Sequence, residues 1–291
     1  MLSLQQRLKT NVPATLESLR EPDETIITDP DDPELQADLA NDEFASFFAD
    51  TSATPKLLIT TSHHPSLSGP THIFAGDLLN VFPGSTFRPR GRTYLSLEKL
   101  AKGASERGYT DLLVINEERN RKKIDAMTLI HLPSGPSCRF RISSVQTCQH
   151  IAGHGNATSH HPELILNNFT TRLGIRVARF FHCLLPKQPE FPGRQVVNLH
   201  NQRDFIFFRR HRYVFKDGTS LPPSDELILV EEVGLQELGP RFTMKLLWIK
   251  QGIASAGWES KLLTDGKEPG DGEVEWEWHP SLVTSRRKFF L

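Results

Sequence analysis

The sequence predicts an α/β protein in which two α/β units follow an extended acidic N-terminal arm. Of its 291 residues, 37% are hydrophobic and 24% are charged, which is typical of a chain that folds around a core. From residue 55 onward, short apolar runs alternate with segments of helical periodicity. Residues 1–55 hold three basic and twelve acidic side chains, a net charge of −9, although the whole chain carries −1. We therefore expect an arm over residues 1–54 and folded halves over residues 55–160 and 161–291.

The arm combines acidic side chains with turn-forming residues. Pro30 and Pro33 stand in the stretch DPDDPELQAD and are expected to break any helix there. The segment DEFASFF at 42–48 favours a short helix. Its phenylalanines predict an anchor that docks the arm on a partner: Phe44, Phe47 and Phe48.

The first half has the pattern of an α/β layer. Ser96 stands at the start of one predicted helix, where its side chain can cap free N–H groups, and Gly108 fits the end of that helix. The predicted elements are a strand at 56–61, helices at 71–82 and 96–107, and strands at 111–116, 127–132 and 139–145.

The second half begins with a predicted helix. Pro162 suits a first helical position, and Glu163 favours the positive end of the helix dipole. The stretch NNFTTRLGIRVARFFHCLLP then predicts an amphipathic helix, because its apolar side chains fall within an arc of about 120°. Strands are expected at 195–200, 204–215 and 241–249, and loops at 217–232 and 253–273.

Three arginines of the amphipathic helix gather on the arc beside its apolar face. They are Arg172, Arg176 and Arg179, spaced four and three residues apart. A helix of this kind packs on a sheet and projects three cations along one rim, where RNA phosphates can bind. A solvated helix flank explains the same spacing.

The run from Arg194 to Phe215, RQVVNLHNQRDFIFFRRHRYVF, mixes arginines with aromatic residues. It lies in the stretch 139–216, which carries twelve basic and three acidic side chains, a net charge of +9. Guanidinium groups bind phosphates and aromatic rings stack on unpaired bases, so this mixture indicates an RNA surface. An edge strand with core aromatics and solvated arginines is the alternative. The candidate RNA-binding residues here are Arg203, Arg209, Arg210, His211 and Arg212.

Alternation along that strand places Arg210 and Arg212 on one face, and Arg209 and His211 on the other. Both faces cannot be buried, because an unpaired buried charge is costly. We expect most of the aromatic rings in the run to belong to the core. Arg241, in GPRF, either fixes the start of a strand or reaches RNA. Three cations precede the terminal FFL and predict an apolar anchor with a basic face: Arg286, Arg287 and Lys288.

The motifs of enzymes and metal sites are absent from the sequence. Cys148 and four nearby histidines suggest zinc, but no second pair of cysteines follows at finger spacing. No nucleophile elbow, phosphate-binding loop or dinucleotide fingerprint occurs. We therefore expect no catalytic residue, metal, cofactor or small-molecule substrate. The three cysteines show no paired spacing, and no apolar run reaches ~18–20 residues, which predicts an intracellular protein without a membrane span.

Four segments of the chain together resemble the Brix-domain family. The likeness covers about residues 55–291, and DEFASFF in the arm also fits one branch of the family. The segments are GHGNATSHHPELILNNFTTRLG at 153–174, RQVVNLHNQRDFIFFRRHRYVF at 194–215, LQELGPRFTMKL at 235–246 and TSRRKFFL at 284–291. The insertions at 217–232 and 254–272 depart from the family pattern.

This resemblance implies two pseudo-symmetric α/β halves, similar to the anticodon-binding domains of certain tRNA synthetases. The branch it points to contains nucleolar factors for assembly of the large ribosomal subunit. The implied partners are large-subunit pre-rRNA, a dedicated protein partner and other preribosomal factors, with no catalysis, in the nucleus and nucleolus. A protein–protein scaffold of the preribosome with incidental RNA contact is the alternative.

The acidic arm does not favour RNA. We predict that it lies along a basic protein, or along the basic face of this chain until RNA displaces it.

Overall fold

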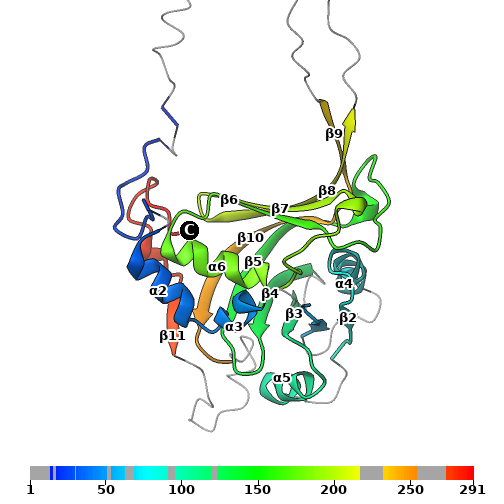
Figure 1. The fold of residues 1–291 in the computed structure, drawn as a ribbon, viewed down its shortest axis with the longest axis horizontal. Helices are drawn as coiled ribbons and strands as arrows, with labels where there is room; N and C mark the ends of the chain where they lie inside the picture. The colour runs from blue at the N-terminus through cyan, green and yellow to red at the C-terminus, as the bar shows by residue number, and fades with distance from the viewer. Residues whose placement is uncertain are drawn as a thin grey trace, which may run out of the picture.

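A single mixed β-sheet of eleven strands organises the molecule in the computed structural model (Figure 1). The structure describes residues 14–15, 18–29, 31–50, 54–62, 69–90, 96–118, 123–216, 232–253 and 273–291. The predicted loops at 217–232 and 253–273 lie almost wholly outside these residues. Within the described part of the chain, no helix is long and apolar enough to span a membrane.

The sheet is continuous from one half of the chain to the other. Its order is β2-β1-β3-β4-β5-β10-β8-β7-β6, with β9 added to β8 and β11 added to β10. The strands are β1 (Leu57–Thr61), β2 (Thr86–Phe87), β3 (Asp111–Glu118), β4 (Lys123–His131), β5 (Ser137–Gln146), β6 (Glu163–Asn167), β7 (Gln195–Gln202), β8 (Phe205–Lys216), β9 (Glu232–Glu237), β10 (Arg241–Lys250) and β11 (Val274–Glu277).

The same connectivity occurs twice. In the first half, β1 pairs in parallel with β3, which is followed by antiparallel β4 and β5. In the second half, β6 pairs in parallel with β7, which is followed by antiparallel β8 and then β10. The halves meet where β5 pairs with β10. The predicted α/β fold is therefore confirmed, and the predicted boundary at residue 160 falls in the connection from β5 to β6.

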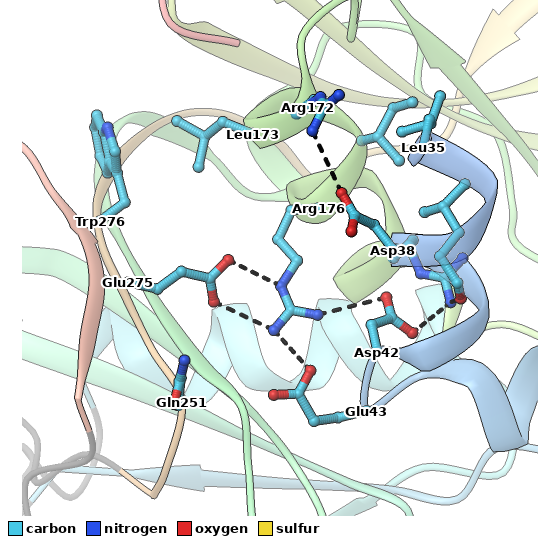
Figure 2. A pocket seen from close by; sticks show the side chains of 13 residues that line it. Leu35, Asp38, Asp42, Glu43, Arg172, Leu173, Arg176, Gln251, Glu275 and Trp276 are labelled. Carbon is cyan, nitrogen blue, oxygen red and sulfur yellow. Dashed lines mark hydrogen bonds and ion pairs between the residues drawn. The ribbon is translucent and has the colours of Figure 1, made fainter. Parts of the chain in front are cut away.

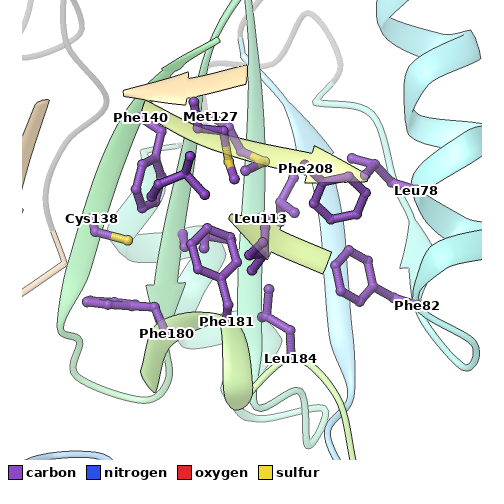
Figure 3. Close-up of a cluster of buried hydrophobic side chains, with 14 of the residues drawn as sticks. Leu78, Phe82, Leu113, Met127, Cys138, Phe140, Phe180, Phe181, Leu184 and Phe208 are labelled. Atoms are coloured by element: carbon purple, nitrogen blue, oxygen red, sulfur yellow. The ribbon is translucent and has the colours of Figure 1, made fainter. Parts of the chain in front are cut away.

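The main core lies between the sheet and three helices on one face. These are α3 (Ala45–Ala49), α4 (Pro70–Val81) and α6 (Arg172–His182). Figure 3 shows part of this cluster, including Phe140, Phe181 and Phe208. A smaller core lies on the opposite face, where α5 (Leu97–Ser105) covers β1, β3 and β4.

The structure corrects the prediction for the proline-rich part of the arm. Residues Pro33–Asn41 form a helix, α2, and Pro33 lies in its first turn. A first-turn proline breaks no helical hydrogen bond, because that N–H has no partner inside the helix. The Asp32 side chain caps this helix by accepting a hydrogen bond from the Glu34 backbone N–H at 3.0 Å.

The start of the second half was also predicted wrongly. Glu163 belongs to strand β6, not to a helix, because the chain here pairs in parallel with β7. Helix α6 begins at Arg172, and Thr171 caps it by accepting from the Gly174 N–H at 2.8 Å. The short strands β9 and β11 had no prediction.

Candidate nucleic-acid interface

The acidic arm lies on the basic rim of α6. Arg172 forms an ion pair with Glu34 at 2.9 Å, and Arg179 forms one with Asp42 at 2.6 Å. Arg176 contacts three carboxylates: Asp42 at 3.4 Å, Glu43 at 2.7 Å and Glu275 at 3.2 Å. Figure 2 shows the contacts of Arg176, and a further ion pair of Arg172 with Asp38 at 3.4 Å, around a cavity of about 460 Å³ between α2, α6 and β11. Of the two positions predicted for the arm, the structure shows the one along the basic face of this chain, and its displacement by RNA stays a prediction.

These ion pairs change the charge that the rim presents. The Arg172 guanidinium lowers the pKa of Glu34. Burial acts to raise the pKa of Glu43, but hydrogen bonds and the charge of Arg176 outweigh it and lower that pKa. The side chains of Arg176 and Arg179 are 14% and 11% exposed. With the arm in place, the α6 arginines therefore bind carboxylates instead of presenting a free cationic surface.

The phenylalanines of the arm pack against this chain's own body, which corrects their expected role as an anchor for another protein. Phe44 is completely buried, with its ring 4.9 Å from that of Phe180 and 5.0 Å from that of His131. Phe47 is buried too, and the Phe48 ring lies 4.1 Å from the Arg179 guanidinium carbon. The arm is thus an integral part of the core.

Strand β8 has one buried and one outward face, as alternation predicts. Arg210 is 0% exposed and donates a hydrogen bond to the Gln195 side chain. Burial lowers the pKa of the Arg210 guanidinium to about 10. Arg210 therefore cannot contact RNA in this fold, and its inclusion among the RNA-binding candidates is corrected. Arg212 lies on the same face of β8 as Arg210, but past the edge of the core, and is exposed.

The outward face of β8 continues across its neighbours. In the sheet register, Phe205 lies opposite Lys245 of β10, and Lys245 lies opposite Arg141 of β5. Residues directly opposite one another share a face of the sheet. We call this surface the open sheet face; its members are Arg139, Arg141, His200, Phe205, Phe207, Arg209, His211 and Lys245.

Helix α5 covers one end of this face and stops short of the rest. Val114, which packs in the α5 cluster, is opposite Thr128, and Thr128 is opposite Arg139. From Arg139 toward β7, no helix in the described residues packs on the face. Arg141 and Phe205 are exposed there, and Arg139, Phe207 and Arg209 are partly exposed. Partial burial lowers the pKa of His211, so at neutral pH this side chain acts as a hydrogen-bonding group without charge.

The rings of β8 are more exposed than predicted. Only Phe208 is buried, whereas Phe205 is 43% and Phe215 is 52% exposed. The expectation that most of them belong to the core is wrong, because the outward face has no covering helix and β8 extends past the body to pair with β9 alone.

The remaining candidates lie around the edges of this face. Arg241 forms an ion pair with Glu237 at 3.2 Å and donates to Gln146, which favours its role at the strand start. Arg203 lies in the β7–β8 turn. The C-terminal segment carries three cations and ends in a buried stretch, where Phe289 and Leu291 are 8% and 1% exposed. The tail is thus an apolar anchor, as predicted, and its cations are Arg286, Arg287 and Lys288.

Three basic residues of the face were missed as site residues: Arg139, Arg141 and Lys245. The alternating pattern RFRISSV could have placed the two arginines on one side of a strand. Lys245 could not be found in this way, because its neighbours depend on pairing between distant strands.

Other chemistry has little support in the described part of the chain. No group of three or more His, Cys, Asp or Glu side chains there is placed to hold a metal. Burial and the nearby Asp77 raise the pKa of the Cys148 thiol to about 12, so the reactive thiolate is disfavoured.

Comparison with known protein families identifies the family to which this fold belongs. The Brix domain model matches residues 66–248, more than half of the chain. The chain belongs to the Brix-domain family, which confirms the resemblance seen in the sequence.

Relatives extend the match over nearly the whole chain. A Brix domain-containing protein of Schizosaccharomyces pombe is 47% identical over 285 residues, covering 98% of this chain and 85% of its own. Ribosome production factor 1 of Saccharomyces cerevisiae is 42% identical over 287 residues, covering 99% and 84%. Ribosome production factor 1 of Mus musculus is 44% identical over 283 residues, covering 96% and 71%. A solved structure of a probable ribosomal biogenesis protein from Aeropyrum pernix K1 is similar with a TM-score of 0.46 at 16% identity, covering 66% of this chain and 96% of that one.

Proposed function

We propose that this protein is a non-enzymatic assembly factor of the large ribosomal subunit that binds folded pre-rRNA on its open sheet face. The uncovered mixture of cations and rings on β5, β8 and β10 carries this proposal. The similarity to proteins named ribosome production factor 1 supports the role in ribosome biogenesis, and with it a place in the nucleus and nucleolus.

The chemistry of the face suits RNA shape better than RNA sequence. Arg141, Arg209 and Lys245 present cations that match phosphates, and the sheet between them offers few groups for reading base edges in a helix. Double-stranded RNA is recognised mostly through phosphates and 2′-hydroxyls across its wide minor groove. The protein would then hold an RNA fold in place while other factors assemble around it.

Crosslinking in cells, followed by sequencing of the attached RNA, tests this proposal. The test variant carries Arg141→Gln, Arg209→Gln and Lys245→Gln. Its matched control carries three equivalent changes among exposed cations at α5, outside the open sheet face: Lys99→Gln, Lys102→Gln and Arg107→Gln. We expect crosslinks to large-subunit pre-rRNA in the wild type and the control, and their loss in the test variant. Equal crosslinking of all three proteins would disprove RNA binding on this face.

A second candidate function is that of a protein–protein scaffold. One observation favours it: the β8–β9 ribbon presents Phe215, Val233 and Leu235 with at least half of each side chain exposed. Their register places them on one face of the ribbon, and exposed apolar patches commonly mark protein interfaces. If Leu235→Ser releases copurifying preribosomal proteins while pre-rRNA crosslinks are absent in the wild type, the scaffold role replaces the RNA-binding one.

A further inference from the structure

A depression of about 450 Å³ lies at the end of the open sheet face, beside the β7–β8 turn. It is lined by Gln202, Arg203, Phe205, Phe207 and Arg286. Its volume is in the range of pockets that hold small molecules, roughly 300–1,000 Å³. The lining differs from the rest of the face, because two aromatic rings meet two guanidinium groups and one amide at the same place.

The turn that builds this depression is fixed by the C-terminal segment. Arg203 and Asp204 both have left-handed backbone, with φ of 53° and 63°. The Asp204 carboxylate accepts hydrogen bonds from the Phe290 N–H at 2.7 Å and the Leu291 N–H at 2.9 Å. The tail is thereby attached to the turn, and Arg286 is brought to a pocket whose other members lie some 80 positions earlier in the chain. The depression is consequently preformed.

The ring of Phe205 is placed for stacking. Lys245 lies over it at 5.6 Å from the ring centroid, and the same ammonium group lies 3.9 Å from the centroid of the Trp278 ring. These contacts restrain the ring from the β10 side, while 43% of Phe205 stays exposed. An exposed, restrained ring between cations is the arrangement with which proteins stack unpaired bases.

We propose that this depression holds one unpaired nucleotide of the bound RNA. The base stacks on Phe205, the Gln202 amide reaches the base edge, and Arg203 and Arg286 contact the flanking phosphates. Bases inside a paired helix cannot enter, since their faces are covered by stacking. The proposal rests on the proposed RNA-binding function and adds a ligand class to it: a helix with a bulged or looped-out nucleotide.

Binding of two hairpin RNAs to the full chain tests this inference. One hairpin carries a single bulged 2-aminopurine, a fluorescent base that is quenched on stacking, and the other is the same hairpin fully paired. The test variant is Phe205→Ala. Its matched control is Phe191→Ala, which removes a 61% exposed ring away from the open sheet face. Because neither ring belongs to the buried core, both variants should fold, and circular dichroism melts verify this.

The wild type and Phe191→Ala should bind the bulged hairpin about fivefold to 150-fold more tightly than the paired one, with quenching of the probe. Phe205→Ala should lose this preference and the quenching, so that it binds the two hairpins equally, and Phe205→Trp should restore both. If both hairpins bind the wild type equally, or if Phe205→Ala keeps the preference, the nucleotide pocket is disproved and the RNA-binding function stands. If neither hairpin binds, both proposals fail.

Discussion

Arg209 and Arg210 are neighbours in the sequence with opposite environments. Arg209 lies on the open sheet face, while Arg210 is buried near Asp77 of α4 and donates a hydrogen bond to Gln195. The Nε and one Nη atom of Arg210 are buried without a hydrogen-bond partner in the protein. A buried guanidinium costs desolvation and contributes only through its contacts and packing volume. Arg210 thus has a structural role, and Arg209 is the candidate for phosphate binding.

Separate substitutions of the two arginines should affect different properties, namely the stability of the fold for Arg210 and RNA binding for Arg209. We expect Arg210→Ala to lower the free energy of unfolding by about 2–4 kcal/mol, because it leaves a cavity and removes the donor to the Gln195 amide oxygen. Arg209→Gln should change stability by less than about 0.5 kcal/mol and weaken RNA binding. Urea denaturation and hairpin-RNA titration measure the two effects. Similar stability losses in both variants would contradict this division.

Contacts of two kinds hold the arm to the body. The ion pairs of Arg172 lie at the solvent-exposed edge of the contact, and exposed pairs contribute little to stability. Burial of Phe44 between α6 and the sheet contributes far more, because a full aromatic side chain leaves water. The buried ring of Phe44, more than the exposed ion pairs, therefore holds the arm on the body. Displacement by RNA would have to extract Phe44 from the core.

Removal of the Phe44 ring should destabilise the whole fold. We expect Phe44→Ala to lower the free energy of unfolding by about 3–5 kcal/mol, the usual cost of a Phe-to-Ala change in a core. The control Phe191→Ala should change it by less than about 0.5 kcal/mol, since that ring is exposed. Chemical denaturation of both variants provides the comparison. A loss near zero for Phe44→Ala would mean that the arm packs on the body only loosely.

The carboxylates of the arm make its docking sensitive to acid. The pKa values of Glu34 and Glu43 are lowered from their ordinary value of 4.5 in the folded protein. A carboxyl group with a lowered folded pKa contributes stability above its unfolded pKa, and that contribution is lost as the pH falls through the folded value. We therefore expect the arm to loosen below about pH 4.5, monitored by hydrogen exchange of α2. Glu43→Gln should flatten this pH dependence; an unchanged profile would assign it to other groups.

At the scale of the whole molecule, charge is partitioned between two surfaces. The net charge of −1 hides an acidic arm that forms ion pairs with the α6 arginines, and a sheet face where Glu237 lies near Arg209 and Asp204 lies near Lys245. Because the α6 arginines form ion pairs with the arm, the open sheet face is the basic surface that remains. This arrangement explains how a chain with no net positive charge can attract a polyanion.

RNA binding should consequently depend strongly on salt. If about four phosphates of a paired helix are neutralised on the open sheet face, affinity should fall about 150-fold between 50 and 200 mM salt. Arg141→Gln should reduce the slope of log affinity against log salt by about one, whereas Lys102→Gln on α5 should leave it unchanged. Filter binding over a salt series measures both slopes. Equal slopes in the two variants would place the RNA elsewhere.

Much of the fold could be predicted from local patterns. The strands of the first half and the helices α4 and α5 are placed by their periodicity and caps, and Ser96 accepts from the Lys99 N–H as its position predicts. The errors fall where non-local pairing or context outweighs local preference. Glu163 begins a strand because β7 lies beside it. Pro33 begins a helix because a proline in the first turn costs no backbone hydrogen bond, whereas a proline further along the helix does.

The site divides in the same way. Alternation along the sequence alone determined that Arg209 and Arg210 point to opposite faces of one strand, and that acidic and basic segments are separated in the chain. Only the tertiary structure decided which face of the strand is buried, that Lys245 and Arg141 lie side by side, and that the acidic arm packs on α6. The physical reason is that direction along a strand is a local property of the backbone. Burial and charge pairing depend on which distant segments pack together, and local sequence does not encode that directly.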